Sequence, residues 1–168
     1  MSASPRILVA ESLTAVAFAE FGDVVEARGH YGLINSGTAR QFADLAGIDV
    51  AGEGGRPCVS IYRATPCALP LPIRMLERHP LGSQLFMPLS GERFLAVVAP
   101  PAAVPDRAAV RAFLTNGHQG VNYRRGTWHH PLIALAGTGE FLVIDRTGPG
   151  ANCDEFQFGD AGIELQLP

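Results

Sequence analysis

Short apolar runs, interrupted by glycine and proline, follow one another along most of the chain. The clearest alternation covers residues 59–63, in which Val59, Ile61 and Arg63 fall on one face of an expected strand. Since the apolar face of a strand usually packs on the core, we expect Arg63 to point inward as well. Further strands are expected over 7–10, from 24–25 onward, and over 83–89, 94–99, 133–136, 141–145 and 163–167.

Turn residues between these runs indicate how the strands connect. Residues 90–92, Ser-Gly-Glu, predict a hairpin between the strands 83–89 and 94–99. Residues 137–139, Gly-Thr-Gly, predict a second hairpin between the strands on either side of them.

Helices are expected to be few and short. Thr14 is placed to cap a helix over 15–21, which ends before a glycine. Asp106 is placed to cap a second helix over 107–114, and a helical turn is expected within 37–47. Many short strands and few helices predict a mainly all-β fold, either an antiparallel β-barrel or a double-sheet jelly roll.

Composition narrows the class of protein. With 168 residues, 47% hydrophobic and 17% charged, the chain is expected to form one globular domain over residues 1–168. A net charge of −3 without a basic stripe is atypical of nucleic-acid-binding proteins. No apolar run approaches the roughly 18 residues of a membrane span, and the run at 7–9 is short for a signal peptide. Three cysteines without a CxxC pair favour reduced thiols, so we expect a cytoplasmic protein.

Two histidine-bearing segments carry the candidate chemistry. Cupin barrels have a first motif of the form HxH, four residues, E, six residues, G. This chain keeps every spacing of that motif, with its positions occupied in order by Glu77, His79, Gln84 and Gly91. The second cupin motif contains a glycine, two residues and a histidine, which Gly126 and His129 match; the asparagine expected later is replaced by Ile133.

Strand geometry gives this spacing a physical meaning. Residues two apart on a strand face the same way, so Glu77 and His79 share a face. Gln84 can rejoin them after the bend at 80–82, and His129 would close the cluster from a distant strand. Four polar groups in an otherwise apolar cavity are typical of a small-molecule site.

Several neighbouring residues are expected to have structural roles. His130 and Arg78 alternate away from the cluster, and Trp128 is expected to pack in the core. A buried Arg63 would need an anionic partner, which is either Glu77 or the carboxylate of a substrate.

The donor atoms also bear on metal binding. The nitrogen and oxygen atoms of His79, His129, Glu77 and Gln84 would suit a divalent transition metal. Against a metal, only two histidines are offered, and the amide of Gln84 is a weaker ligand than the glutamate it replaces.

Three segments resemble those of a known family. Residues 77–84 (ERHPLGSQ), 116–123 (NGHQGVNY) and 128–131 (WHHP) resemble hallmark segments of the ureidoglycolate lyases, formerly called ureidoglycolate hydrolases. The likeness runs from about 18 to 154. It implies a cupin-like β-barrel, a homodimer, and cleavage of ureidoglycolate to glyoxylate and urea late in allantoin breakdown. It also implies, for some members, nickel or another divalent ion.

The implied reaction gives each candidate residue a role. One carbon of ureidoglycolate bears a hydroxyl, a ureido nitrogen and a carboxylate, so cleavage needs a base, a proton for the leaving nitrogen and a cation for the carboxylate. We expect His129 or Glu77 to be the base. We expect His79 and Gln84 to polarise the substrate or bind a metal, and Arg63 to anchor the carboxylate. No dinucleotide or phosphate loop is visible, so no organic cofactor is expected.

Two other functions are compatible with a cupin-like fold. One is a different metal-dependent reaction on a small carboxylate, such as isomerisation or oxygenation. The other is a non-catalytic domain that binds a small ligand, because fold alone does not determine function.

Overall fold

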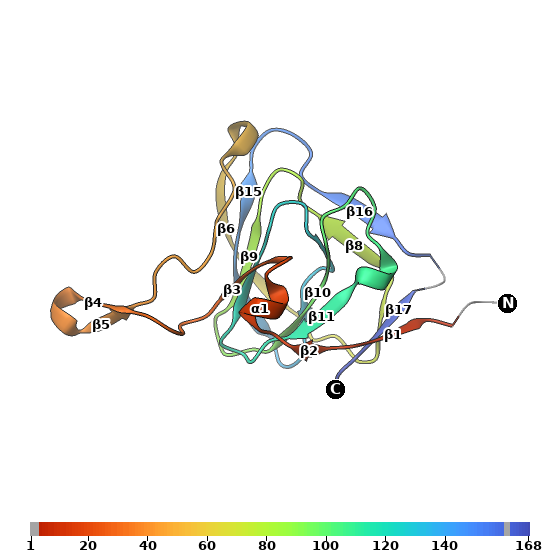
Figure 1. The fold of residues 1–168 in the computed structure, drawn as a ribbon, viewed down its shortest axis with the longest axis horizontal. Coiled ribbons are helices and arrows are strands. Elements are labelled where there is room, and N and C mark those ends of the chain that lie inside the picture. The colour runs from red at the N-terminus through yellow and green to blue at the C-terminus, as the bar shows by residue number, and fades with distance from the viewer. Residues whose placement is uncertain (1–3, 160–161) are drawn as a thin grey trace.

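A computed structural model describes residues 4–159 and 162–168, and the described chain forms layers of β-sheet joined by short segments (Figure 1). The central layer is a seven-stranded sheet in the order β16 (Asp154–Gln157), β8 (Met75–Arg78), β13 (Trp128–His129), β10 (Phe94–Ala99), β11 (Arg111–Leu114) and β2 (Glu11–Ser12), with β14 (Ile133–Ala134) also pairing with β10. On one side lies a five-stranded sheet in the order β3 (Gly22–Val25), β12 (Gly120–Tyr123), β9 (Gln84–Pro88), β15 (Gly139–Thr147) and β6 (Arg56–Ala64). On the other lies a three-stranded sheet of β1 (Arg6–Val9), β17 (Ile163–Gln166) and β7 (Leu71–Ile73).

Two hydrophobic cores hold these layers together. The first fills the space between the five- and seven-stranded sheets and includes Phe18 of the helix α1 (Ala15–Phe18), Phe86 and Phe94. The second lies between the seven- and three-stranded sheets and includes Leu76 and Leu165. All six residues of β10 are buried, because this strand is covered on both faces. The mainly all-β, cupin-like fold is thus confirmed.

The strands were predicted better than their pairing. β9 and β10 exist, but they do not form a hairpin with each other. β9 pairs with β12 and β15, whereas β10 pairs with β11, β13 and β14. The expected hairpin is wrong because residues 89–93 carry the chain from one sheet to the facing one.

The second expected hairpin is wrong for the same reason. β14 pairs with β10 of the seven-stranded sheet, whereas β15 pairs with β9 and β6 of the five-stranded sheet. The glycine-rich segment 137–139 therefore joins two layers and does not fold one ribbon back on itself.

Most of the helix expected over 107–114 is also absent. Asp106 does cap a turn, since its side chain accepts a hydrogen bond from the Ala108 N–H at 2.8 Å. The turn covers only Arg107–Ala109, and the chain then continues as β11. Burial favours a strand over a helix here, because Phe113 of β11 is fully buried in the first core.

The first helix is confirmed but is shorter than expected. Thr14 caps it by accepting a hydrogen bond from the Ala17 N–H at 3.2 Å, and α1 ends at Phe18. No helix forms within 38–47; a short strand, β5 (Ala39–Gln41), lies there. No helix in the described residues has the length and apolar character of a membrane span.

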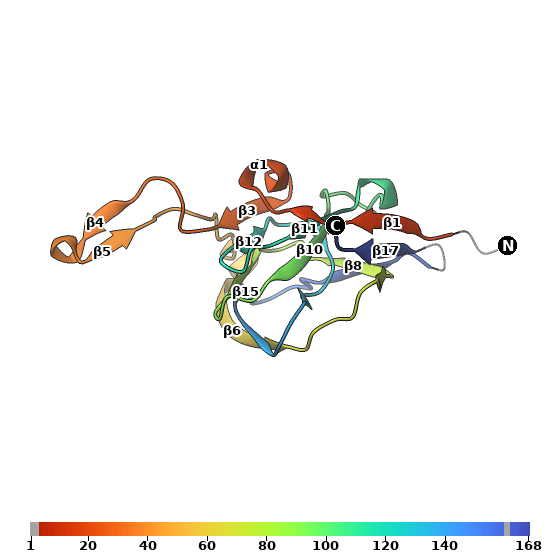
Figure 2. The ribbon, with the colours of Figure 1, turned by 90° about the horizontal axis from the view of Figure 1, so that it is seen from below.

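Residues 29–43 form a hairpin arm that projects from the body beside the five-stranded sheet (Figures 1 and 2). β4 (Gly32–Ile34) and β5 form its two strands, joined by a 3-10 turn at Asn35–Gly37. A third 3-10 turn, at Gly52–Gly54, lies in the segment that leads into β6.

Candidate functional site

Strand pairing brings the candidate residues together from distant parts of the chain. Glu77 of β8 lies directly opposite His129 of β13 in the seven-stranded sheet. Gln84 begins β9 in the facing sheet, opposite Tyr123 of β12. His79 lies in the bend that carries the chain from β8 to β9. The site is therefore built across the interior, between the two larger sheets.

Three of these side chains form a compact cluster. One potential ligand atom each from Glu77, His79 and His129 lies within 4.8 Å of the other two. The Glu77 carboxylate is 3.9 Å from Nδ1 of His129, and the two imidazole centroids are 5.2 Å apart. Gln84 borders the cluster, with its Oε1 3.2 Å from Nε2 of His79.

Backbone carbonyls orient both histidine rings. Nδ1 of His79 donates to the Asn152 carbonyl at 2.6 Å, and its Nε2 is directed at the side-chain amide of Gln84. Among the described residues, the His129 ring makes one hydrogen bond, a long one of 3.3 Å from Nδ1 to the carbonyl of the next residue. Its Nε2 is buried and has no hydrogen-bond partner among the described residues.

This donor set suits a divalent transition metal. Imidazole nitrogens and a carboxylate oxygen are ligands that such ions prefer, and a backbone carbonyl commonly fixes the ring of a metal-binding histidine. The unpartnered ring nitrogen of His129 is the kind of buried polar atom that a bound ion or substrate would satisfy. His79, His129 and Glu77 therefore fit a metal centre.

Burial controls the protonation of the cluster. Burial raises the pKa of Glu77, and Glu155 raises it further, while His79 opposes the rise. Burial lowers the pKa of His129 to about 3, assisted by nearby His79, so this ring is neutral at pH 7. Burial also raises the pKa of Tyr123, whose ring stacks on His129 at 4.3 Å between centroids.

A cavity of about 370 Å³ opens beside the cluster. Its lining residues are Tyr62, Arg63, Ala64, Glu77, Gln84, Phe86, Pro131 and Leu132. This volume suits a small ligand. A larger depression of about 500 Å³ lies near Glu26 and Gln119, but none of the cluster residues line it. The smaller cavity is therefore the better candidate for the substrate site.

The expectation that Arg63 points inward is wrong. Its side chain is 72% exposed and pairs with Glu140 at 2.6 Å, not with Glu77. The strand parity was inferred from Val59 and Ile61, which themselves lie on the outer face of the sheet. Arg63 nevertheless lies at the mouth of the cavity and is the only cationic side chain among its described lining residues.

Comparison with known proteins identifies the family of this chain. A family model described as ureidoglycolate lyase matches residues 5–166. The chain belongs to the ureidoglycolate lyase family. It is 54% identical over 156 residues to the ureidoglycolate lyase of Azotobacter vinelandii, covering 92% of this chain and 94% of that protein. It is 51% identical over 165 residues to that of Pseudomonas syringae, covering 97% and 96%.

The residues expected to be structural in this ureidoglycolate lyase family member lie around the cluster. Arg78 pairs with Asp154 at 2.8 Å and its guanidinium lies 4.7 Å from the centroid of Trp128. Trp128 is buried in the second core. The His130 ring donates to the Pro131 carbonyl at 2.9 Å. None of these three side chains joins the cluster.

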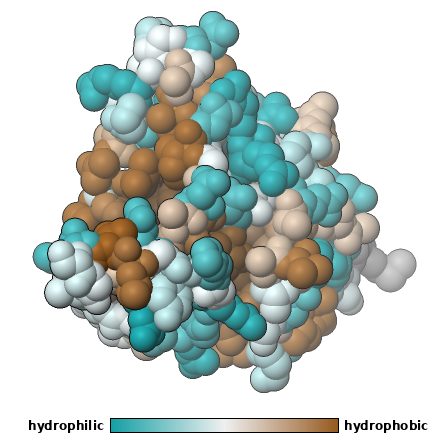
Figure 3. Space-filling model, turned by 60° about the vertical axis from the view of Figure 1, so that its left-hand side comes forward, coloured by the Kyte–Doolittle hydropathy of each residue, from teal (hydrophilic) through white to brown (hydrophobic). Residues whose placement is uncertain are grey.

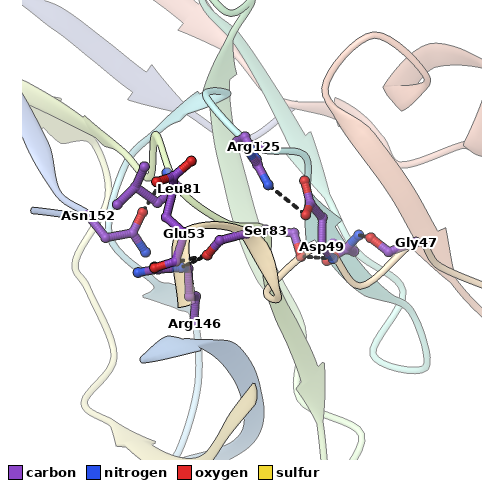
Figure 4. Close-up of polar contacts among 10 residues, drawn as sticks. Gly47, Asp49, Glu53, Leu81, Ser83, Arg125, Arg146 and Asn152 are labelled. Carbon is purple, nitrogen blue, oxygen red and sulfur yellow. Dashed lines mark hydrogen bonds and ion pairs between the residues drawn. The ribbon is translucent and has the colours of Figure 1, made fainter. Parts of the chain in front are cut away.

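Sequence reasoning missed the residues that support the loop carrying His79. The Leu81 N–H donates to Oδ1 of Asn152 at 2.7 Å, and Ser83 exchanges two hydrogen bonds with Asp49 (Figure 4). Arg146 is buried and donates to carbonyls of the surrounding loops, including that of Gly52. Asn152 and Arg146 lie within the range 18–154 over which the sequence resembles the family, which was the available signal; their contacts could not be deduced from spacing.

The aromatic walls were also missed. Tyr123 ends the segment 116–123 and forms one side of the His129 pocket through ring stacking. Tyr62 packs edge-on against Phe86 at 5.9 Å and lines the cavity. Choosing the opposite parity for β6 would have identified Tyr62, because it alternates with Arg63.

Proposed function

We propose that this chain cleaves ureidoglycolate to glyoxylate and urea, as a carbon–nitrogen lyase of allantoin breakdown. The observation that carries the proposal is the cluster of Glu77, His79 and His129 beside a small cavity with one cation at its mouth. Membership of the ureidoglycolate lyase family supports the same reaction.

The reaction breaks one carbon–nitrogen bond without adding water. The substrate hydroxyl loses its proton, the oxygen forms the carbonyl of glyoxylate, and the electron pair of the C–N bond leaves with the urea nitrogen. That nitrogen then takes up a proton, so a single group can accept the first proton and return it.

Glu77 is the better candidate for this proton transfer. Burial raises the pKa of its carboxylate, which makes it a stronger base than an exposed glutamate. The buried His129, with its pKa lowered to about 3, is a weak base. We therefore assign His129 to hold the substrate or an ion, and Glu77 to accept and return the proton.

The remaining residues position the substrate. His79 and Gln84 face each other at 3.2 Å and present polar atoms to the reacting carbon and its substituents. Arg63, at the mouth, supplies the cation for the substrate carboxylate once its guanidinium turns from Glu140.

A divalent ion such as nickel would be held by His79, His129 and one carboxylate oxygen of Glu77, whose other oxygen would remain available to accept and return the proton. When bound, it would act as a Lewis acid that stabilises negative charge on the substrate oxygen. No organic cofactor enters this scheme. We further propose that the chain works as one domain and as a homodimer, in the cytoplasm.

The products test the proposal. Purified protein is incubated with racemic ureidoglycolate, and glyoxylate, urea and ammonia are measured together. We expect glyoxylate and urea in equal amounts and one enantiomer left behind. Ammonia released at the rate of glyoxylate, without urea, would show hydrolysis of the ureido group and overturn the lyase assignment.

A further inference from the structure

Tyr62 is the one polar side chain among the described lining residues of the cavity to which the proposed reaction gives no task. Glu77 transfers the proton, Arg63 binds the carboxylate, and the amide of Gln84 positions the substrate. The hydroxyl of Tyr62 makes no hydrogen bond with the part of the chain that the structure describes. A phenol at the wall of the cavity is therefore available to a ligand.

The sheet register turns Tyr62 toward the interior. It lies directly opposite Phe141 of β15, which is fully buried in the first core. Its neighbours in β6, Ile61 and Arg63, lie on the outer face of the sheet. Figure 3, turned toward this side of the molecule, shows apolar side chains gathered on it. The Tyr62 ring packs edge-on against Phe86, so its hydroxyl is the part left for a bound molecule.

The surroundings of Tyr62 keep its phenol protonated. Burial raises its pKa above the ordinary value of 10.0, and the carboxylates of Asp145 and Glu77 raise it further. Because a phenol with a raised pKa is neutral at pH 7, its O–H group is a hydrogen-bond donor there and not a base. The influence of Glu77 also places the donor near the proposed proton acceptor, in agreement with their shared cavity.

Cleavage of the substrate creates a demand for such a donor. When the C–N bond breaks, its electron pair goes to the urea nitrogen and is shared by resonance with the ureido carbonyl oxygen. A hydrogen bond to that oxygen is stronger in the transition state than in the bound substrate, since negative charge grows there as the bond breaks. The proposed reaction assigns no other side chain to this oxygen.

We infer that Tyr62 is a catalytic residue, whose hydroxyl donates a hydrogen bond to the ureido oxygen and stabilises the leaving urea. This inference rests on the proposed lyase reaction. The phenolic proton stays on Tyr62 throughout. Glu77 accepts the proton of the substrate hydroxyl and returns it to the leaving nitrogen, so atoms and charge balance without a further acid.

The substrate carboxylate is the alternative partner for the hydroxyl, because Arg63 follows Tyr62 in β6. A guanidinium offers this group a positive charge and two parallel donors, so the carboxylate is better served by Arg63. The two partners also differ in their kinetic effect. A contact with the carboxylate is equally strong before and during the reaction and acts on KM, whereas a contact that strengthens with the charge on the leaving group acts on kcat.

Steady-state kinetics of Tyr62→Phe tests the role, because this variant removes only the hydroxyl and keeps the ring that packs on Phe86. We expect kcat to fall roughly tenfold to a hundredfold and KM to change less than about twofold. Tyr31→Phe is the matched control, since Tyr31 is also 40% exposed but belongs to the arm, and its kcat should not change.

The outcomes separate this role from the lyase reaction itself. A wild-type chain that forms no glyoxylate and urea would overturn both. An active wild-type chain with an unchanged kcat in Tyr62→Phe would overturn the role of Tyr62 alone. A raised KM with an unchanged kcat would place the hydroxyl on the carboxylate and would also overturn it.

A substrate analogue tests which atom accepts the hydrogen bond. The thioureido analogue, made by condensing glyoxylate with thiourea, has sulfur in place of the ureido oxygen, and sulfur is a weak acceptor. We therefore expect the kcat of Tyr62→Phe on this analogue to lie within about threefold of the wild-type value. A loss as large as that with ureidoglycolate would show that the hydroxyl acts on another atom and would overturn the inference.

Discussion

At the scale of the single residue, the neighbouring histidines His129 and His130 differ in burial and in contacts. His129 is almost fully buried, stacks on Tyr123 and belongs to the cluster, whereas His130 donates to a backbone carbonyl outside it. The alternation of side chains along β13 and its continuation thus places two adjacent, chemically identical rings in different environments.

Substitution of each histidine in turn tests whether one acts in the reaction and the other in stability. We expect His129→Ala to lower kcat roughly a hundredfold or more, the usual scale for a group at the reacting centre. His130→Ala should mainly lower the free energy of unfolding. Steady-state kinetics and urea titrations of both variants provide the measurement. Equal losses of kcat would contradict the placement of His129 in the site.

The buried His129 also makes stability depend on pH. Its pKa falls from 6.5 in the unfolded chain to about 3 in the folded one, so between these values only the unfolded chain binds the proton. The free energy of unfolding should therefore fall as pH drops below about 6.5, by up to about 1.4 kcal/mol per pH unit. The lowered pKa of His130 acts in the same direction, and the raised pKa of Glu77 opposes it.

Urea titrations between pH 7.5 and 5.5, with a chelator present, measure this dependence. His129→Gln should have a flatter profile than the wild-type chain, since glutamine does not titrate. Superimposable profiles for the two proteins would mean that His129 does not carry the effect.

Asn152 is expected to act through the loop that carries His79. Its side-chain oxygen accepts a hydrogen bond from the Leu81 N–H, and its carbonyl accepts one from His79. Asn152→Leu should lower kcat or divalent-ion affinity roughly tenfold, the scale reported for partners that orient metal-binding residues. Asn152→Asp keeps an oxygen acceptor and should recover most of the loss. If both variants behave alike, the hydrogen bond to Leu81 is not what positions the loop.

At the scale of the element, local pattern predicted where strands lie better than what they pair with. The range 94–99 was found because its apolar run is continuous, and β10 has the same bounds. Its partners could not be found, because residues 89–93 cross between layers, and a Ser-Gly-Glu segment suits a crossing as well as a hairpin. The helix expected over 107–114 failed because burial of Phe113 between sheets outweighs local helix signals.

The pairing of β3 with β12 depends on one glycine. A Cβ atom added at Gly22 would lie 1.9 Å from the carbonyl oxygen of Asn122, a backbone atom that cannot move without breaking the ladder. Gly22→Ala should therefore destabilise the fold by about 3 kcal/mol. Gly32→Ala, which meets nothing within 4 Å, is the control and should change stability little. Thermal unfolding of both variants measures the difference in stability. A Gly22→Ala variant as stable as Gly32→Ala would contradict the prediction.

At the scale of the whole molecule, the apolar outer face of the five-stranded sheet explains why Arg63 was wrongly predicted to point inward. Inward-facing apolar residues are the rule for a protein that acts alone, and that rule assigned Arg63 to the interior with Val59 and Ile61. The structure places all three side chains on the outer face of the sheet. The cluster itself was predictable from motif spacing, because cross-strand geometry within one barrel does not depend on oligomeric state.

The proposed dimer links stability to concentration. Because unfolding would release two chains from each dimer, the Tm of the wild-type chain should rise with protein concentration. Differential scanning calorimetry over a hundredfold range of protein concentration measures this dependence of Tm. A wild-type Tm that does not move with concentration would contradict coupled unfolding and dissociation.

The parallel pairing of β1 with β17 constrains how the chain is made in the cell. Residues near the two extremes of the sequence lie side by side in the three-stranded sheet, so Leu8 and Leu76 cannot be fully covered until β17 has left the ribosome. Synthesis from the N-terminus therefore leaves the second core open until the last strand emerges, and such contacts between distant residues form slowly. A ribosome stalled before residue 163 should thus hold a chain that proteases cut within β1 and β7, while the finished protein resists them.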